Sequence, residues 1–85
     1  MATELTITAV DFVNPQSGIE VFTFEYKLFS SSVWILISNT ASVMPDGDLV
    51  SPLVVSPLTP GTVYDLMATS NCSSPAVSYQ TQFNT

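Results

Sequence analysis

Apolar residues recur at every second position along most of this chain, and this period limits the fold more than any other feature. The clearest example is the stretch FTFEYKL, which alternates Phe22, Phe24, Tyr26 and Leu28 with Thr23, Glu25 and Lys27. Successive side chains of a β-strand point to opposite faces, so this stretch predicts a strand with one face in the core and one in water. No stretch repeats its apolar residues with the period of a helix, and we therefore expect an all-β domain.

Turn signals separate six stretches of this kind, which predicts a single domain over residues 1–85 without a repeat or a linker. The expected strands cover residues 5–12, 22–28, 33–37, 49–58, 64–70 and 77–83. A change of parity at Ala9-Val10 predicts a β-bulge in the first strand. Pro52 and Pro57 cannot donate to a ladder, so the fourth strand is expected to be short and at a sheet edge. Six short strands with turns between them are typical of a sandwich or a barrel.

A polar segment, residues 38–48, follows the third expected strand and carries the turn signal Pro45-Asp46-Gly47. The cluster NPQSG, residues 14–18, is a second turn signal.

The most specific motif is Leu58-Thr-Pro60-Gly61-Thr-Val-Tyr64, which is followed by a new alternating stretch. Pro60 presets one turn dihedral, and Gly61 supplies a permissive one. Leu58, Pro60, Gly61 and Tyr64 together predict a tyrosine corner. In this corner the Tyr64 ring packs in the core, and its hydroxyl bonds an upstream backbone group as the chain passes between two sheets.

The chain resembles a fibronectin type III domain from about Leu5 to Thr85. The corner motif is its most specific feature. Other matches are Phe12-Val13-Asn14-Pro15 in the place of the family's Trp-x-x-Pro, residues 22–27 as strand C, Trp34 in strand C′, and residues 64–68 as strand F. The resemblance implies an immunoglobulin-like antiparallel β-sandwich of about six to seven strands.

Two departures from the family pattern concern its first strands. Phenylalanine stands at position 12, where the family has tryptophan, and no residues remain upstream of strand 5–12 to form strand A if that strand is B. An alternative register makes residues 4–10 strand A and residues 19–26 strand B, but it loses the match at residues 22–27. Both registers give the same fold class.

The charge of the chain excludes several classes of partner. Seven carboxylates face a single cation, Lys27, for a net charge of −6. Such a chain repels phosphate backbones, so we expect no nucleic-acid partner and no electrostatic attachment to an anionic membrane. The N-terminus lacks the pattern of a signal peptide, and the longest apolar run, residues 33–37, is too short to span a bilayer.

Residues that carry chemistry are scarce. The chain has no histidine, and its single cysteine, Cys72, has no basic neighbour in sequence and no partner for an internal disulfide. Asp46 and Asp48 lie in one turn, which supplies too few ligands for a calcium loop and no pair of carboxylates across a cleft. We therefore expect no enzyme activity, no cofactor and no metal.

Trp34 admits three interpretations, because the stretch VWILI is apolar on both parities. Trp34 could cover Tyr26 or Lys27 within the hairpin, as in members of the resembling family. It could instead belong to an interface with another protein chain, since clustered exposed apolar residues mark interfaces. A third interpretation is a sugar stacked on its ring. The candidate interface residues are Phe29, Trp34, Leu36 and Met44, together with Leu5 and Ile7 on an edge strand that lacks a neighbour.

The expected function is that of a non-enzymatic structural or adhesive module that contacts other protein chains in a larger assembly. A stand-alone sandwich of this family is similar to capsid or tail decoration subunits of tailed bacteriophages, which implies a location on the virion surface. One alternative is a domain of a secreted or cell-surface protein. The other is a module that binds a receptor or a surface glycan. The genes that flank this one would distinguish a virion protein from a domain of a secreted or cell-surface protein. A glycan array would test the module that binds a glycan.

Overall fold

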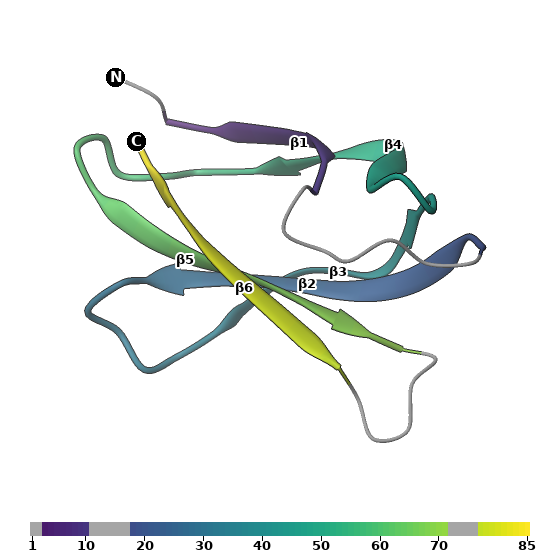
Figure 1. Ribbon diagram of the computed structural model, residues 1–85. Coiled ribbons are helices and arrows are strands. Elements are labelled where there is room, and N and C mark those ends of the chain that lie inside the picture. The colour runs from purple at the N-terminus through teal and green to yellow at the C-terminus, as the bar shows by residue number, and fades with distance from the viewer. Residues whose placement is uncertain (1–2, 11–17, 72–76) are drawn as a thin grey trace.

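The computed structural model describes residues 3–10, 18–71 and 77–85 (Figure 1), and in these ranges it contains six antiparallel β-strands and no helix. The strands are β1 (Leu5–Ala9), β2 (Glu20–Leu28), β3 (Ile35–Val43), β4 (Asp48–Val55), β5 (Val63–Ser70) and β6 (Ser78–Asn84). The all-β prediction is thereby confirmed.

The strands form one curled sheet in the order β1-β4-β3-β2-β5-β6. Strand β2 lies at its centre and pairs with both β3 and β5, while β6 pairs with β5. Strand β4 pairs with β1 but meets β3 at a single residue pair, Val43 and Leu49. Figure 1 shows the result: the sheet bends at this link, so that β1 and β4 lie over the concave face of the other strands.

The core lies inside this curl, where the alternating apolar residues of β2 and β5 meet. Phe22 and Phe24 of β2 are almost completely buried, and so are Leu66 and Ala68 of β5. The two strands are paired in regular register along β5, so their period-two patterns bury the same face. The alternation ends at Leu28, which is 41% exposed because it lies at the end of β2.

Strand β3 is longer than the sequence predicts and includes most of the polar segment, up to Val43. Its polar half is a strand because β2 pairs with it, with Val21 opposite Ser42 and Phe22 opposite Ala41. Ala41 and Val43 are buried, although the residues between positions 37 and 41 are all polar. This segment is therefore a strand because its backbone pairs with β2, and its side-chain pattern does not predict a strand.

A large irregularity separates the two halves of the β1–β4 ladder. Ile7 lies opposite Leu53 but Ala9 lies opposite Asp48, so the four residues from Leu49 to Pro52 face the single residue Thr8. The predicted bulge of the first strand at Ala9-Val10 is therefore wrong in its position and in its strand: the register shifts between Ile7 and Ala9, and the extra residues, Pro52 among them, belong to β4. The prediction that this strand is short and lies at a sheet edge is wrong, because β4 has eight residues and lies between β1 and β3 in the strand order. Pro52 is accommodated at a point where β4 pairs with neither neighbour. The segment Phe12–Pro15 lies outside the described residues.

The turn between β3 and β4 also holds the end of β1. Gly47 has a φ of 95°, and its carbonyl oxygen accepts a hydrogen bond of 2.8 Å from the N–H of Val10. A Cβ atom at this position would lie 2.8 Å from the Val10 carbonyl oxygen. Glycine is therefore required here both by the backbone conformation and by the close approach of β1.

Candidate interaction surface

Tyr64 fixes the loop that leads into β5. Its ring is 5% exposed and stacks on Phe83 at a centroid distance of 5.3 Å. Its hydroxyl accepts a hydrogen bond of 2.9 Å from the N–H of Thr59, five residues upstream. Gly61 has a φ of 71°, and Leu58 is buried. The buried ring and its bond to an upstream backbone group are those that the Leu58–Tyr64 motif predicts.

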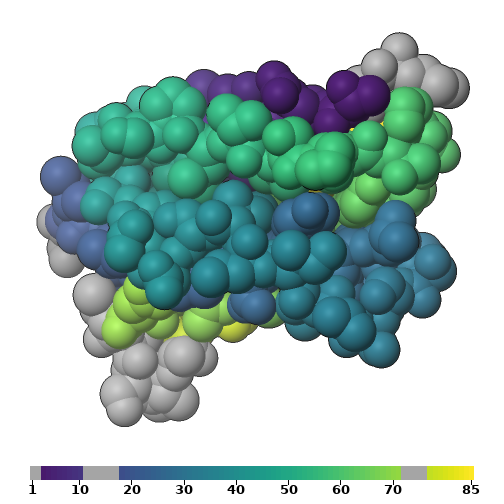
Figure 2. Space-filling view, turned by 180° about the vertical axis from the view of Figure 1, so that it is seen from behind, coloured from purple at the N-terminus to yellow at the C-terminus, as the bar shows by residue number. Residues whose placement is uncertain are grey.

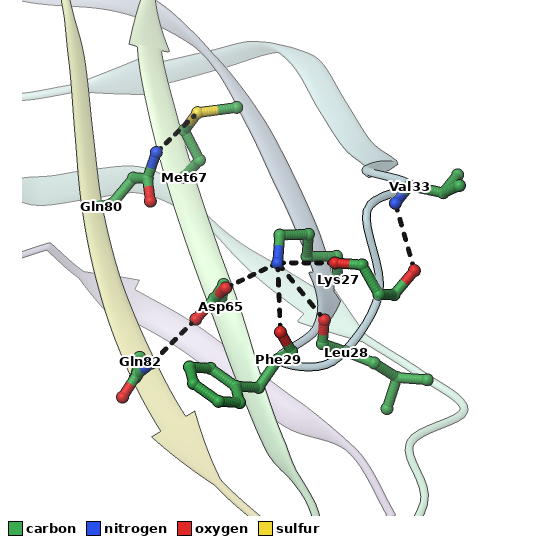
Figure 3. Close-up of polar contacts among 9 residues, drawn as sticks. Lys27, Leu28, Phe29, Val33, Asp65, Met67, Gln80 and Gln82 are labelled. Atoms are coloured by element: carbon green, nitrogen blue, oxygen red, sulfur yellow. Dashed lines mark hydrogen bonds and ion pairs between the residues drawn. The ribbon is translucent and has the colours of Figure 1, made fainter.

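Lys27, the only lysine or arginine of the chain, organises the loop between β2 and β3 (Figure 3). Its Nζ atom lies 2.8 Å from Oδ2 of Asp65 on β5 and donates a hydrogen bond of 2.9 Å to the Ser31 carbonyl oxygen. Two further carbonyl oxygens of the loop, those of Leu28 and Phe29, lie 3.5 Å away. The ammonium group is thus surrounded by the loop that it holds.

Trp34, which directly precedes β3, completes this arrangement. The Nζ atom of Lys27 lies 5.3 Å from the centre of the Trp34 ring, within the range of a cation–π contact. Of the three interpretations of Trp34, the structure places the ring over Lys27, and the ring is itself half-buried.

Asp65 is held in its ionised form by its neighbours. The hydrogen bond from Lys27 keeps the pKa of Asp65 below the ordinary value of an aspartate, and a hydrogen bond of 3.1 Å from Gln82 acts in the same direction. Partial burial opposes this shift. Only 14% of each side chain of the Lys27–Asp65 pair is exposed. The one cation of the chain is therefore already paired and shielded from a partner.

An apolar patch lies along the line where β3 and β4 run side by side with little pairing. Its residues are each about half exposed: Ile35 and Leu36 on β3, and Val50 and Val54 on β4. We call these four residues the β3–β4 patch. Figure 2 views the face that carries both strands. Two hollows follow the line, one of about 240 Å³ beside Leu36 and Val54 and one of about 300 Å³ beside Val50.

The other candidate residues are divided between different parts of the molecule. Phe29 is 60% exposed and lies in the loop around Lys27, close to Trp34 in the chain. Met44 does not join them, because it lies in the turn at the opposite end of β3 and bonds Asp48 and Gly47 through its backbone. Ile7 is buried, and Leu5 is partly buried and packs against the core.

The sequence interpretation missed Val50 and Val54. The signal that could have identified them is the one that singled out residues 33–37, since β4 is also apolar on both parities, at Leu49-Val50 and at Leu53-Val54-Val55. A strand with one wet face does not show this pattern.

Groups that could support metal chemistry are absent from the described ranges. Residues 3–10, 18–71 and 77–85 contain no cluster of three or more histidine, cysteine, aspartate or glutamate side chains that could hold a metal ion. Asp46 caps its own turn by accepting a hydrogen bond of 3.0 Å from the N–H of Asp48. Cys72 lies outside the described residues. No helix in the described part of the chain is long and apolar enough to cross a membrane.

Comparison with known proteins identifies no match for this chain. No family model matches the chain, no curated protein matches it in sequence, and no solved structure matches its fold.

Proposed function

We propose that this chain is a fibronectin type III-like β-sandwich that acts as a non-enzymatic interaction module. The strand pairing supports the fold. With the Val43–Leu49 link set aside, β1 and β4 pair as strands B and E do, and β3-β2-β5-β6 follow the order C′-C-F-G. In the alternative register the first two strands would be neighbours, whereas β1 pairs with β4. Strand A then has no counterpart among the described residues.

The observation that carries the proposed function is the β3–β4 patch. Isolated exposed apolar side chains are common on proteins, but Ile35, Leu36 and Val54 of two adjacent strands line one hollow, and clusters of this kind are found at interfaces. Phe29 is a separate exposed apolar residue of the Lys27 loop, and its N–H bonds the carbonyl oxygen of Val63 on β5. Burial of the β3–β4 patch against another protein chain would remove it from water, which is the main driving force of such association.

The setting that we propose is a virion, with the domain as a capsid or tail decoration subunit exposed on the particle surface. This step rests on the resemblance to fibronectin type III-like sandwiches of tailed bacteriophages. A domain of a secreted or cell-surface protein would use the same patch for adhesion. Binding of a receptor or a surface glycan is a second candidate, because Trp34 and Phe29 are aromatic residues in one loop region beside Ser30–Ser32.

Site-specific photocrosslinking in the organism or particle that carries the protein tests the proposal. A photoreactive amino acid at position 36 or 54, in the patch, is expected to crosslink to one protein of defined mass. The same amino acid at position 80, an exposed position on β6, is the matched control and is expected to give no such product. Leu36→Asp should abolish co-sedimentation with the assembly and leave the fold intact.

Two results would contradict the proposal. One is a crosslinking pattern that is the same at positions 36, 54 and 80. The other is a Leu36→Asp variant that still co-sediments with its assembly. Selective binding of the isolated protein to one glycan on an array, lost in Trp34→Ala, would favour the second candidate.

A further inference from the structure

One backbone edge of β1 has no partner strand within the described part of the chain. Strand β1 stands at the end of the strand order, and its only ladder is with β4. Backbone N–H and C=O groups of an antiparallel strand alternate between its two sides, so every second residue of β1 directs these groups away from β4. An open edge of this kind is a template for another strand.

A groove runs along this edge. Its volume is about 300 Å³, and all residues from Leu5 to Val10 line one wall. Thr81 and Gln82 of β6 line the other wall, with the buried Leu66 of β5 at the base. The groove therefore lies between the two ends of the curled sheet, β1 and β6.

The burial of β6 shows that this side of the core is incompletely covered. Side chains of β5 that point into the curl are buried, from Tyr64 to Ser70. Tyr79, Thr81 and Phe83 are their partners on β6, yet each remains partly exposed. Tyr79 and Phe83 pack against the core from this position. A strand placed beside β1 would cover the open side and satisfy the free backbone groups at once.

We infer that this groove accepts an extended segment of a different protein chain, which adds as a strand beside β1. The inference rests on the proposed function, since it names the kind of partner that the interaction module takes, but it concerns a different face from the β3–β4 patch. Strand addition of this type obtains its affinity from main-chain hydrogen bonds and its specificity from alternate side chains.

The groove defines the chemistry of the segment. Its backbone must donate to β1, which excludes proline at the pairing positions. Every second side chain must be apolar, because one face of the added strand covers Leu66 and the inner face of β6. Its charged residues must be basic, because the chain has a net charge of −6 and its one cation is already paired with Asp65. A second copy of this chain would bring the same negative charge to the groove, so we assign the groove to a different protein.

A fused donor segment tests the inference on the full chain. The segment Lys-Thr-Val-Thr-Val-Thr-Lys follows Thr85 through a Gly/Ser linker of about ten residues, which spans about 17 Å and thus the length of β1. Thr3 and Thr85 both bond to the stretch between Leu58 and Gly61, so the attachment point lies near the start of β1. Some amides of β1 exchange rapidly in the unfused protein. We expect these amides to exchange in the fusion at about one tenth of that rate or more slowly.

Matched controls distinguish the contributions of backbone pairing, of charge and of the groove to the protection of the β1 amides. Replacement of the two valines of the segment by proline should abolish the protection, and replacement of its lysines by glutamate should weaken it. Thr81→Arg in the groove wall should reduce the protection, whereas Gln80→Arg, which changes the same charge on the exposed face of β6, should not. A dispersed amide spectrum confirms that each variant is folded.

Three results would overturn the inference. One is a folded fusion whose β1 amides exchange as fast as before. The second is protection of all β1 amides in the dilute unfused protein, which would mean that the chain covers its own edge. The third is protection that rises with the concentration of unfused protein, which would assign the groove to a second copy. None of these results depends on the crosslinks at positions 36 and 54, so failure of the proposed function is recognised separately.

Discussion

At the scale of single residues, two polar groups hold segments that would otherwise be free loops. Tyr64 holds the approach to β5 through one hydrogen bond to Thr59, and Lys27 holds the loop between β2 and β3. Both groups combine a partly buried polar contact with an aromatic neighbour, Phe83 for Tyr64 and Trp34 for Lys27. Such contacts are specific enough for single-atom substitutions to test them.

Tyr64→Phe removes only the hydroxyl and leaves the N–H of Thr59 without its acceptor. We expect a loss of about 1–2 kcal/mol in the free energy of unfolding, measured as a lower urea midpoint. Tyr79→Phe is the control, because within the described part of the chain the Tyr79 hydroxyl makes no hydrogen bond. Equal midpoints for Tyr64→Phe and the natural protein would contradict the role of the corner.

The Lys27–Asp65 pair makes stability depend on pH. Because the pKa of Asp65 is lower in the folded protein than in the unfolded chain, its contribution is complete above the unfolded pKa and is lost as the pH falls through the folded pKa. Asp65→Asn should therefore be less stable than the natural protein at pH 7, and this difference should shrink below about pH 4. Urea midpoints of both proteins between pH 2 and pH 7 provide the measurement. A difference that does not change with pH would show that the carboxylate charge is unimportant.

At the scale of elements, the turn between β3 and β4 connects three strands, because it also bonds the end of β1. Gly47→Ala forces a Cβ atom against the Val10 carbonyl oxygen and strains a positive φ. We expect a loss of about 1–3 kcal/mol in the free energy of unfolding. Gly18→Ala is the matched control and should change little, since no atom lies within 4 Å of its Cβ position. Similar losses for both variants would show that general backbone stiffening is the cause.

The sequence predicts an element well where local contacts determine its conformation, and poorly where distant contacts do. The alternation of β2 and the Leu58–Tyr64 motif are local patterns, and the structure has the strand and the Thr59–Tyr64 hydrogen bond that they predict. The polar half of β3 follows from pairing with β2, which no pattern within residues 38–43 reveals. For the candidate surface, exposure of Leu36 and Phe29 agrees with the sequence interpretation. The sequence interpretation also includes Met44, which lies beyond the far end of β3. The length and direction of β3 depend on the whole sheet, so the sequence around Met44 does not reveal this distance.

At the scale of the whole molecule, stability depends on one core inside the curl of the sheet. Phe24→Ala should cost about 3–5 kcal/mol, a large part of the roughly 4–13 kcal/mol expected for a domain of 85 residues. Phe29→Ala, at a phenylalanine that is 60% exposed, should cost less than about 0.5 kcal/mol. Urea unfolding followed by circular dichroism compares the two variants. Similar midpoints would show that the concave face of the sheet is not the core.

The contact between Lys27 and Trp34 also provides an intrinsic optical probe. Trp34 is the only tryptophan of the chain, so all indole emission of the protein comes from one ring beside one ammonium group. That ring lies in the loop region that carries the exposed Phe29, directly before the strand that carries Leu36. The fluorescence of the unlabelled protein therefore reports on the environment of this region. A titration with a partner that covers β3 can be followed by emission, without a dye that would occupy the surface under study.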